Sequence, residues 1–494
     1  MRSADRTQIW VPGRGHGAFE WFSLLGVALI LPWAVWSLVS LGHYAGLQSS
    51  QFDLEVALFV TLAVTYLVLH GLRCSAWTSA TTLITLLNSG LLGIVIVPLW
   101  RFARGYETVD ESYTKSMLVA IMGYAAFWVG SLLFKQGVQP RFVPSELVTR
   151  RRVEFACTAL VAVGVAANLF LWRSGLFGYG ADVLSKQDAL GFLQWLTFAG
   201  SMLTTALIAL SIERFGKPHP TRFTKGLFVV ALLLATSFGV VQGFKGAVLF
   251  PLVYVLLIYS TIKTKIPIGS VVVPLALILL IYPFEQAYRK NLDEGYRSQV
   301  NTLDGQIQTL EQTFNDAFLS FGANTSDARS QSTETASARL SFLTYIRDVV
   351  NLPSPQMLEG DEKIWLAPIY PLIPRFFWKD KPVFNKGVRL SIILGRGDRT
   401  SSAPTLIGDL FALDGYFGVV LGMFLVGIVL QLYMNWNWRT ALTEKRLFIY
   451  ISMLLLMIDF EDDLVSHIAN VVQTGILTVA LSYLIYGRNA ASQT

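Results

Sequence analysis

Long apolar runs separated by short polar stretches dominate this chain. Most runs match the roughly 20 residues that a helix needs to cross the hydrocarbon core of a bilayer. The pattern therefore predicts an all-α polytopic membrane protein with about 12 spanning helices. The expected spans are 21–41, 54–70, 79–100, 115–134, 153–172, 193–212, 225–241, 247–263, 269–284, 415–434, 447–459 and 467–486. The eleventh is short for a span.

Composition agrees with a membrane protein and argues against nucleic-acid binding. Apolar residues make up 53% of the chain and charged residues 15%, whereas soluble domains average about 25% charged residues. The formal net charge is +6, but the basic residues lie between apolar runs, where they set membrane topology. The only cysteines, Cys74 and Cys157, flank apolar runs and cannot form a disulfide framework or a zinc site.

The basic residues gather in alternate loops between the expected spans. These loops contain Arg73; Lys135, Arg141 and residues 150–152; Arg214, Lys217, Arg222 and Lys225; Lys263 and Lys265; Arg439, Lys445 and Arg446; and Arg488. Because basic loops stay in the cytoplasm, we expect both termini there. The alternation divides the chain into a membrane part (1–284), a large outer loop (285–414) and a second membrane part (415–494).

The outer loop is too long for a simple connection and should be partly helical. One helix is expected where apolar residues recur at helical spacing, at Leu303, Ile307, Leu310, Phe314, Ala317 and Phe321. A second is expected over 339–350, after a flexible stretch at 322–337. Five prolines between 353 and 374 predict turning or extended chain beyond it.

Cations gather in the parts of the chain that this topology places outside. Lys245 lies in the turn between two spans, Arg289 follows the ninth span, and Arg339, Arg375 and Lys381 lie in the loop. Arginine binds phosphate oxygens through two parallel hydrogen bonds and lysine adds a compact charge. The group suits a pyrophosphate, although single cations at span ends also serve as headgroup anchors.

Two residues near the outer ends of the last spans are candidate bases. Asp409 precedes the tenth span and His467 begins the twelfth; either side chain type can remove a proton from a sugar hydroxyl. The acidic group Asp459, Glu461, Asp462 and Asp463 has oxygen ligands for a divalent cation. A solvated helix end explains that group better, so we predict no metal.

Nucleotide-binding signatures are missing from the sequence. It contains neither a phosphate-cradling glycine loop nor a dinucleotide fingerprint. We therefore expect no cofactor. An enzyme of this kind would use an already activated donor that resides in the membrane.

Several short motifs in the second half carry a family resemblance. They are the Gly-Phe-Lys-Gly turn within 242–251, Ala-Tyr-Arg at 287–289, Ala-Arg-Leu-Ser at 338–341, the stretch 373–382, and the stretch 400–409 followed by Gly-Tyr-Phe-Gly. With the large loop before the last spans, the chain resembles the bacterial O-antigen polymerase family and the related O-antigen ligases. It departs from that pattern at Asp409, where glutamate is expected, and at Phe244, where a small residue is common.

The resemblance implies a membrane glycosyltransferase of the GT-C class in the bacterial inner membrane. Such an enzyme polymerises lipid-linked oligosaccharide repeats at the periplasmic face, with undecaprenyl-pyrophosphate-linked glycans as donor and acceptor, and a chain-length regulator is a further candidate partner. Arg375, Arg289 and Lys245 would hold the pyrophosphate, and Arg339 and Lys381 would also bind substrate. Asp409 or His467 would be the base.

Three other functions remain open at this point. A ligase would perform the same chemistry on a lipid A core acceptor. A flippase for the same lipid-linked unit would place charges along a path through the membrane centre, whereas the charges here lie at span ends. A structural subunit of an export complex would have no converging pocket.

Overall fold

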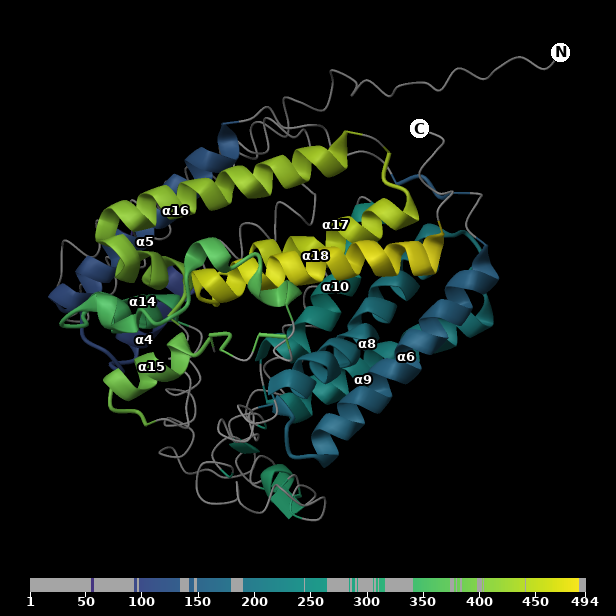
Figure 1. The fold of residues 1–494 in the computed structure, drawn as a ribbon, viewed down its shortest axis with the longest axis horizontal. Coiled ribbons are helices and arrows are strands. Elements are labelled where there is room, and N and C mark those ends of the chain that lie inside the picture. The colour runs from purple at the N-terminus through teal and green to yellow at the C-terminus, as the bar shows by residue number, and fades with distance from the viewer. Residues whose placement is uncertain are drawn as a thin grey trace.

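The computed structural model describes the chain in segments, and all regular elements within them are helices (Figure 1). The described residues are 55–56, 93–95, 97–133, 142–145, 149–178, 190–243, 245–263, 284, 287–288, 291, 305, 308–309, 311–315, 341–373, 377–378, 380–382, 384–397, 402, 404–439 and 441–487. Within them, Phe142 and Leu442 form an isolated parallel β-bridge.

Seven of the described helices are long and apolar enough to cross a membrane. They are α5 (Glu111–Leu132), α6 (Arg150–Arg173), α8 (Leu190–Gly216), α9 (Arg222–Gln242), α10 (Lys245–Lys263), α16 (Leu406–Trp438) and α18 (Leu464–Tyr486). They correspond to the fourth to eighth, tenth and twelfth predicted spans. The chain is therefore a multi-pass, all-helical membrane protein across its described residues.

The other predicted spans are only partly covered by the described residues. The first, second and ninth fall almost wholly outside them, and the third ends in α4 (Val97–Ala103). The eleventh corresponds to α17 (Glu444–Met457), which has 14 residues. At 1.5 Å per residue α17 is about 21 Å long, less than the roughly 30 Å of a hydrocarbon core.

The outer loop contains short helices and turns. The second helix expected there is α14 (Phe342–Val350), which begins after its N-cap Ser341. The proline-rich stretch forms three 3-10 turns, η4 (Pro355–Leu358), η5 (Ile364–Leu366) and η6 (Tyr370–Leu372), followed by α15 (Lys386–Ile393). The first expected helix is described only at 305, 308–309 and 311–315, all helical.

The tenth helix begins earlier than the hydropathy pattern predicts. α16 starts at Leu406, and its backbone leaves helical geometry at Asp414 (φ −151°, ψ 36°) and Gly415 (φ 55°, ψ −140°). The expected boundary at 415 is therefore a break inside α16, where a glycine accepts the positive φ. Asp409 lies in a short helical segment before the break.

Two groups of helices are joined by α17 and α18 (Figure 1). In one group α5 packs along α16; in the other, α6 packs on α8 and α9 on α10. Glycines bring α5 and α16 close together: a Cβ at Gly130 would collide with the carbonyl of Phe424, and one at Gly427 with that of Phe127. Small residues allow this backbone approach in membrane helices, where water exclusion does not drive association.

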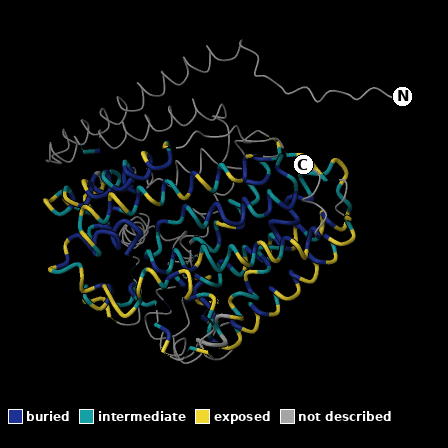
Figure 2. Tube along the Cα trace, turned by 45° about the horizontal axis from the view of Figure 1, so that its top comes forward, coloured by how far each residue is buried: buried dark blue, intermediate teal, exposed yellow. Residues whose placement is uncertain are grey.

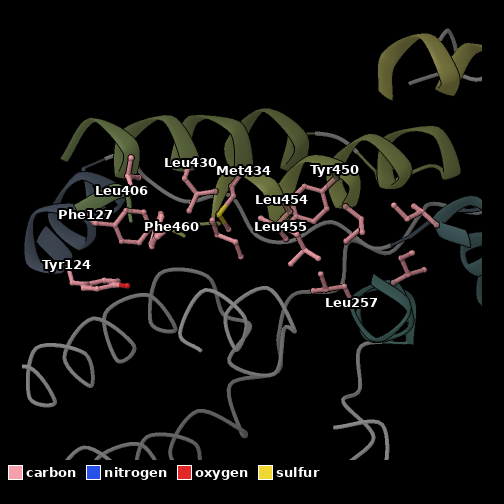
Figure 3. Close-up of a cluster of buried hydrophobic side chains, with 14 of the residues drawn as sticks. Tyr124, Phe127, Leu257, Leu406, Leu430, Met434, Tyr450, Leu454, Leu455 and Phe460 are labelled. Atoms are coloured by element: carbon pink, nitrogen blue, oxygen red, sulfur yellow. The ribbon is translucent and has the colours of Figure 1, made fainter. Parts of the chain in front are cut away.

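The largest core cluster of the described residues extends from α5, α16 and α17 to α6, α8, α9 and α10, and Figure 3 shows part of it. Phe127 of α5 and Phe460 of the α17–α18 loop meet edge to face at 5.3 Å between ring centroids. Burial decreases toward the outer helices (Figure 2). There large apolar side chains are exposed, such as Phe155 at 79% and Leu233 at 62%, as lipid-facing positions require.

At each end of the bundle, hydrogen bonds join loops that the charge pattern places on the same side of the membrane. At one end, Arg150 bonds to the carbonyl of His219, Arg152 to that of Leu484, and Glu444 accepts the amide of Ser145. We call this the Arg150 end. At the other, the Asp409 end, the start of α5 meets α14, and the starts of α16 and α18 lie together.

Candidate functional site

A buried ion pair lies at the Asp409 end. Lys386, the first residue of α15, places its Nζ 2.7 Å from Oδ1 and 3.0 Å from Oδ2 of Asp409. The side chains are only 3% and 1% exposed. Because each charge would be costly to bury alone, the pair holds α15 against α16.

Asp409 also connects α16 to α18. Its Oδ2 accepts the backbone N–H of Leu464 at 2.9 Å, and three residues earlier the N–H of Leu406 donates to the carbonyl of Phe460 at 2.9 Å. Thr405, the N-cap of α16, has φ 59°, a conformation rare for a β-branched residue. These contacts fix the first turns of both helices relative to each other.

The contacts of Asp409 bear on its predicted role as a base. Both oxygens are already engaged, and Oδ2 accepts two hydrogen bonds. Protonation would remove the negative charge that pairs with Lys386, and the side chain is only 1% exposed to a substrate. The base role of Asp409 stays a prediction, and the geometry describes a residue that positions two helices.

His467, the second predicted base, lies in the first turns of α18 and is 6% exposed. Its imidazole contacts the main chain of Asp459. Its Nδ1 has no hydrogen-bond partner among the described residues. An imidazole nitrogen without a hydrogen-bond partner can accept a proton when it carries the lone pair, so His467 stays a candidate base.

The acidic loop between α17 and α18 contains Asp462, Asp463 and Glu461. Asp463 caps α18 by accepting the N–H of Ser466 at 2.9 Å, and Asp462 accepts the amide of Asn470 at 3.0 Å. No group of acidic, histidine or cysteine residues within the described parts of the chain is arranged to hold a metal ion. Helix capping thus accounts for part of the cluster.

Burial raises the pKa of Asp462 to about 6, and the neighbouring charge of Asp463 adds to the rise. The folded protein therefore binds this proton more tightly than the unfolded chain does. The stabilisation is fully present below the ordinary pKa of 3.8 and is lost as the pH rises through about 6.

We expect Asp462→Asn to raise the thermal unfolding midpoint above pH 6 and to lose this advantage near pH 4. The amide keeps an oxygen for Asn470 but carries no charge. Unfolding of the detergent-purified chain across this pH range measures the effect. Glu359→Gln, an exposed site in another loop, is the matched control. Equal midpoints for wild type and Asp462→Asn at every pH would contradict the prediction.

A cavity of about 460 Å³ lies between α8, α18 and the loop that follows η6. Its volume falls in the roughly 300–1,000 Å³ range of small-molecule sites. Seven hydroxyl or amide side chains contribute to its wall: Thr197, Ser201, Thr205, Asn470, Gln473, Thr474 and Thr478. Phe198, Phe384, Pro371 and Pro382 contribute apolar surface.

Lys381, one of the predicted substrate-binding residues, lies in the wall of this cavity. It is 7% exposed, and its Nζ donates to the carbonyl of Ile373 at 3.2 Å. His467 lies one turn before Asn470 of the opposite wall, on the same helix. The structure thus brings Lys381 near the helix that carries His467.

The side chains of the remaining predicted cations are not among those that the structure describes. Arg289, Arg339 and Arg375 fall outside the described residues. Lys245 begins α10, but only its backbone is described. Their convergence on one pocket therefore stays a prediction.

Two other arginines at the Asp409 end already have carboxylate partners. Arg347 pairs with Asp110 at 2.7 Å and stacks over Tyr113, while Arg396 pairs with Asp348 at 2.8 Å. A phosphate would have to compete with these carboxylates. Lys381 differs from these arginines in that it lines the cavity.

Two features of the site are not among the sequence predictions. Lys386 has no signal in the sequence, because α15 is short and its partner Asp409 lies 23 residues away. The polar face of α18 does have a signal. Asn470, Thr474 and Thr478 follow His467 at helical spacing within an otherwise apolar run.

The fold and the cavity define a multi-pass, all-helical membrane protein with a polar site at the Asp409 end. The family model described as "Domain of unknown function (DUF8712)" matches residues 114–437. Since this is about two thirds of the chain, the protein belongs to that family. The match runs from α5 through α16 and ends before α18. Comparisons with curated proteins and with solved structures gave no match.

Proposed function

We propose that this protein is a membrane glycosyltransferase that polymerises lipid-linked oligosaccharide repeats into a cell-surface polysaccharide. The observation that carries the proposal is the cavity between α8 and α18, with Lys381 in one wall and the helix of His467 as the other. A polar cavity between membrane helices suits a substrate that has both a lipid and a glycan. The family resemblance of the motifs agrees with this chemistry.

In this proposal the donor is a glycan on undecaprenyl pyrophosphate. The acceptor hydroxyl attacks the anomeric carbon, a new C–O bond forms, and the bond to the pyrophosphate oxygen breaks. Arg375, Arg289 and Lys245 stabilise the negative charge of the leaving group, with Lys381 and Arg339 as further contacts. His467 accepts the hydroxyl proton, and Asp409 fixes the helix that carries His467.

The proposed location is the bacterial inner membrane, with the Asp409 end at the periplasmic face. Basic loops gather at the Arg150 end, which the positive-inside rule assigns to the cytoplasm. The site then faces the compartment where lipid-linked repeats are polymerised.

A flippase for a lipid-linked oligosaccharide is the second candidate. The observation in its favour is that the polar wall of the cavity continues along α18 to Thr478, fourteen residues after the helix begins. At 1.5 Å per residue this is about 21 Å along the span. A flippase moves its substrate without forming a glycosidic bond.

Incubating the purified protein in proteoliposomes with lipid-linked repeat units tests the proposal. We expect a ladder of products that differ by one repeat, because each transfer adds one unit. Movement of the repeat across the bilayer without a ladder would support the flippase. Transfer only when lipid A core is added would identify a ligase, and neither transfer nor movement would refute both classes.

A further inference from the structure

Three polar side chains on α18 have no hydrogen-bond partner among the described residues. No described residue hydrogen-bonds to the amide of Gln473 or to the hydroxyls of Thr474 and Thr478, and all three line the cavity. In a membrane-spanning helix such groups are costly unless they meet water or a ligand. The three side chains therefore indicate that the cavity holds water or a ligand that forms hydrogen bonds.

A second polar stripe lies across the cavity on α8. Thr197, Ser201 and Thr205 recur every four residues and so lie on one face of that helix. The Ser201 hydroxyl donates to the carbonyl of Phe198 at 2.7 Å, and the Thr205 hydroxyl to that of Ser201 at 3.2 Å. Their oxygen lone pairs stay available as acceptors.

The described lining restricts the chemistry of the occupant. Among its described residues there is one cation, Lys381, and no carboxylate. The polar groups opposite each other on α8 and α18 are uncharged donors and acceptors. Phe198 and Phe384 add aromatic surface. An uncharged ligand with many hydroxyl groups and apolar C–H faces matches this mixture, whereas a pyrophosphate would meet a single ammonium group among the described lining residues.

We propose that the cavity between α8 and α18 binds the neutral sugar part of the substrate within the thickness of the membrane. The pyrophosphate then lies outside the cavity. This inference rests on the proposed function. Gln473, Thr474 and Thr478 contact sugar hydroxyls from α18, and Thr197 and Ser201 do so from α8. Lys381 marks the end of the cavity nearest the phosphate.

Cysteine labelling in proteoliposomes tests the assignment. The chain contains only Cys74 and Cys157, and Cys157 is buried, so both are first replaced by alanine. Single variants Gln473→Cys, Thr474→Cys and Thr478→Cys are then exposed to a hydrophilic maleimide. Ile476→Cys and Val479→Cys, which lie on the exposed face of the same helix, are the matched controls.

We expect the three cavity positions to react and the two controls to stay unlabelled, because maleimide reaches only hydrated thiols. Lipid-linked oligosaccharide extracted from the source cells should protect the cavity positions. At about ten times its Kd it should slow labelling about ten-fold. Undecaprenyl pyrophosphate without glycan should leave the rate unchanged.

Other outcomes overturn the inference. Unreactive cavity positions would show that the polar strip is not hydrated, and equal protection by undecaprenyl pyrophosphate would assign the cavity to the lipid phosphate. Because the assay detects binding and not transfer, it separates the two proposals. Protection without a polymer ladder refutes only glycosyl transfer. A ladder without protection refutes only the sugar site.

Discussion

Asp409→Ala is expected to destabilise the protein by about 3–5 kcal/mol, the cost of leaving a buried charge unpaired. The substitution leaves the ammonium group of Lys386, which is 3% exposed, without its carboxylate partner. It also removes the acceptor of the Leu464 amide. The starts of α15, α16 and α18 lose their shared contact. Thermal or denaturant unfolding of the detergent-purified protein measures the effect.

A double variant separates the loss of the pair from the loss of packing. Replacing both charges, as in Lys386→Met with Asp409→Leu, should recover most of the stability, because apolar residues of similar volume often replace a buried ion pair without loss. Arg396→Met is the matched control: its side chain is 45% exposed, so the change should cost less than about 1 kcal/mol. A double variant as unstable as Asp409→Ala would contradict this account.

The positions of the helices could be predicted from the sequence more easily than the contacts of the site. The Lys386–Asp409 ion pair is an example of such a contact. Hydropathy predicts spans because a bilayer excludes unsatisfied backbone groups and requires about 20 apolar residues. That rule predicted α5, α6, α8, α9, α10 and α18 within a few residues. It placed the start of α16 at 415 because the two turns before the break, which contain Asp409, are not needed to cross the membrane.

No comparable pattern in the sequence predicts the contacts between distant segments. Lys386 and Asp409 meet because α15 folds back onto α16, and nothing in the spacing of the two residues shows this. The sequence did predict that Lys381 and His467 lie near the same end of the bundle. It did not show that a cavity lies beside both, since the cavity requires α8 and the loop after η6 to be placed against α18.

The polar face of α18 could be predicted from the sequence in part. His467, Asn470 and Thr474 are visible as a stripe in an apolar run, and polar residues within spans are a signal of function. The residue pattern alone leaves open which helix faces the stripe. The structure adds α8 and its own stripe of hydroxyls, which makes the stripe one wall of a site.

The second large effect is expected at His467. His467→Gln keeps a hydrogen-bonding side chain but cannot take a proton at neutral pH, so the rate of polymer formation should fall by about 10²–10⁴-fold. The buried Nδ1 has no hydrogen-bond partner among the described residues, and His467 lies one turn from the cavity. Timed assays of ladder formation from lipid-linked repeats measure the rate.

Two comparisons make this result specific to proton transfer. Asp409→Asn keeps the shape of the carboxylate and an acceptor for the Leu464 amide, so its loss of rate should follow its loss of stability. His467→Gln should lose rate at unchanged unfolding midpoint and unchanged protection by lipid-linked oligosaccharide. If His467→Gln forms polymer at the wild-type rate while folded Asp409→Asn forms none, the base is Asp409, and the ion pair loses its negative charge during each transfer.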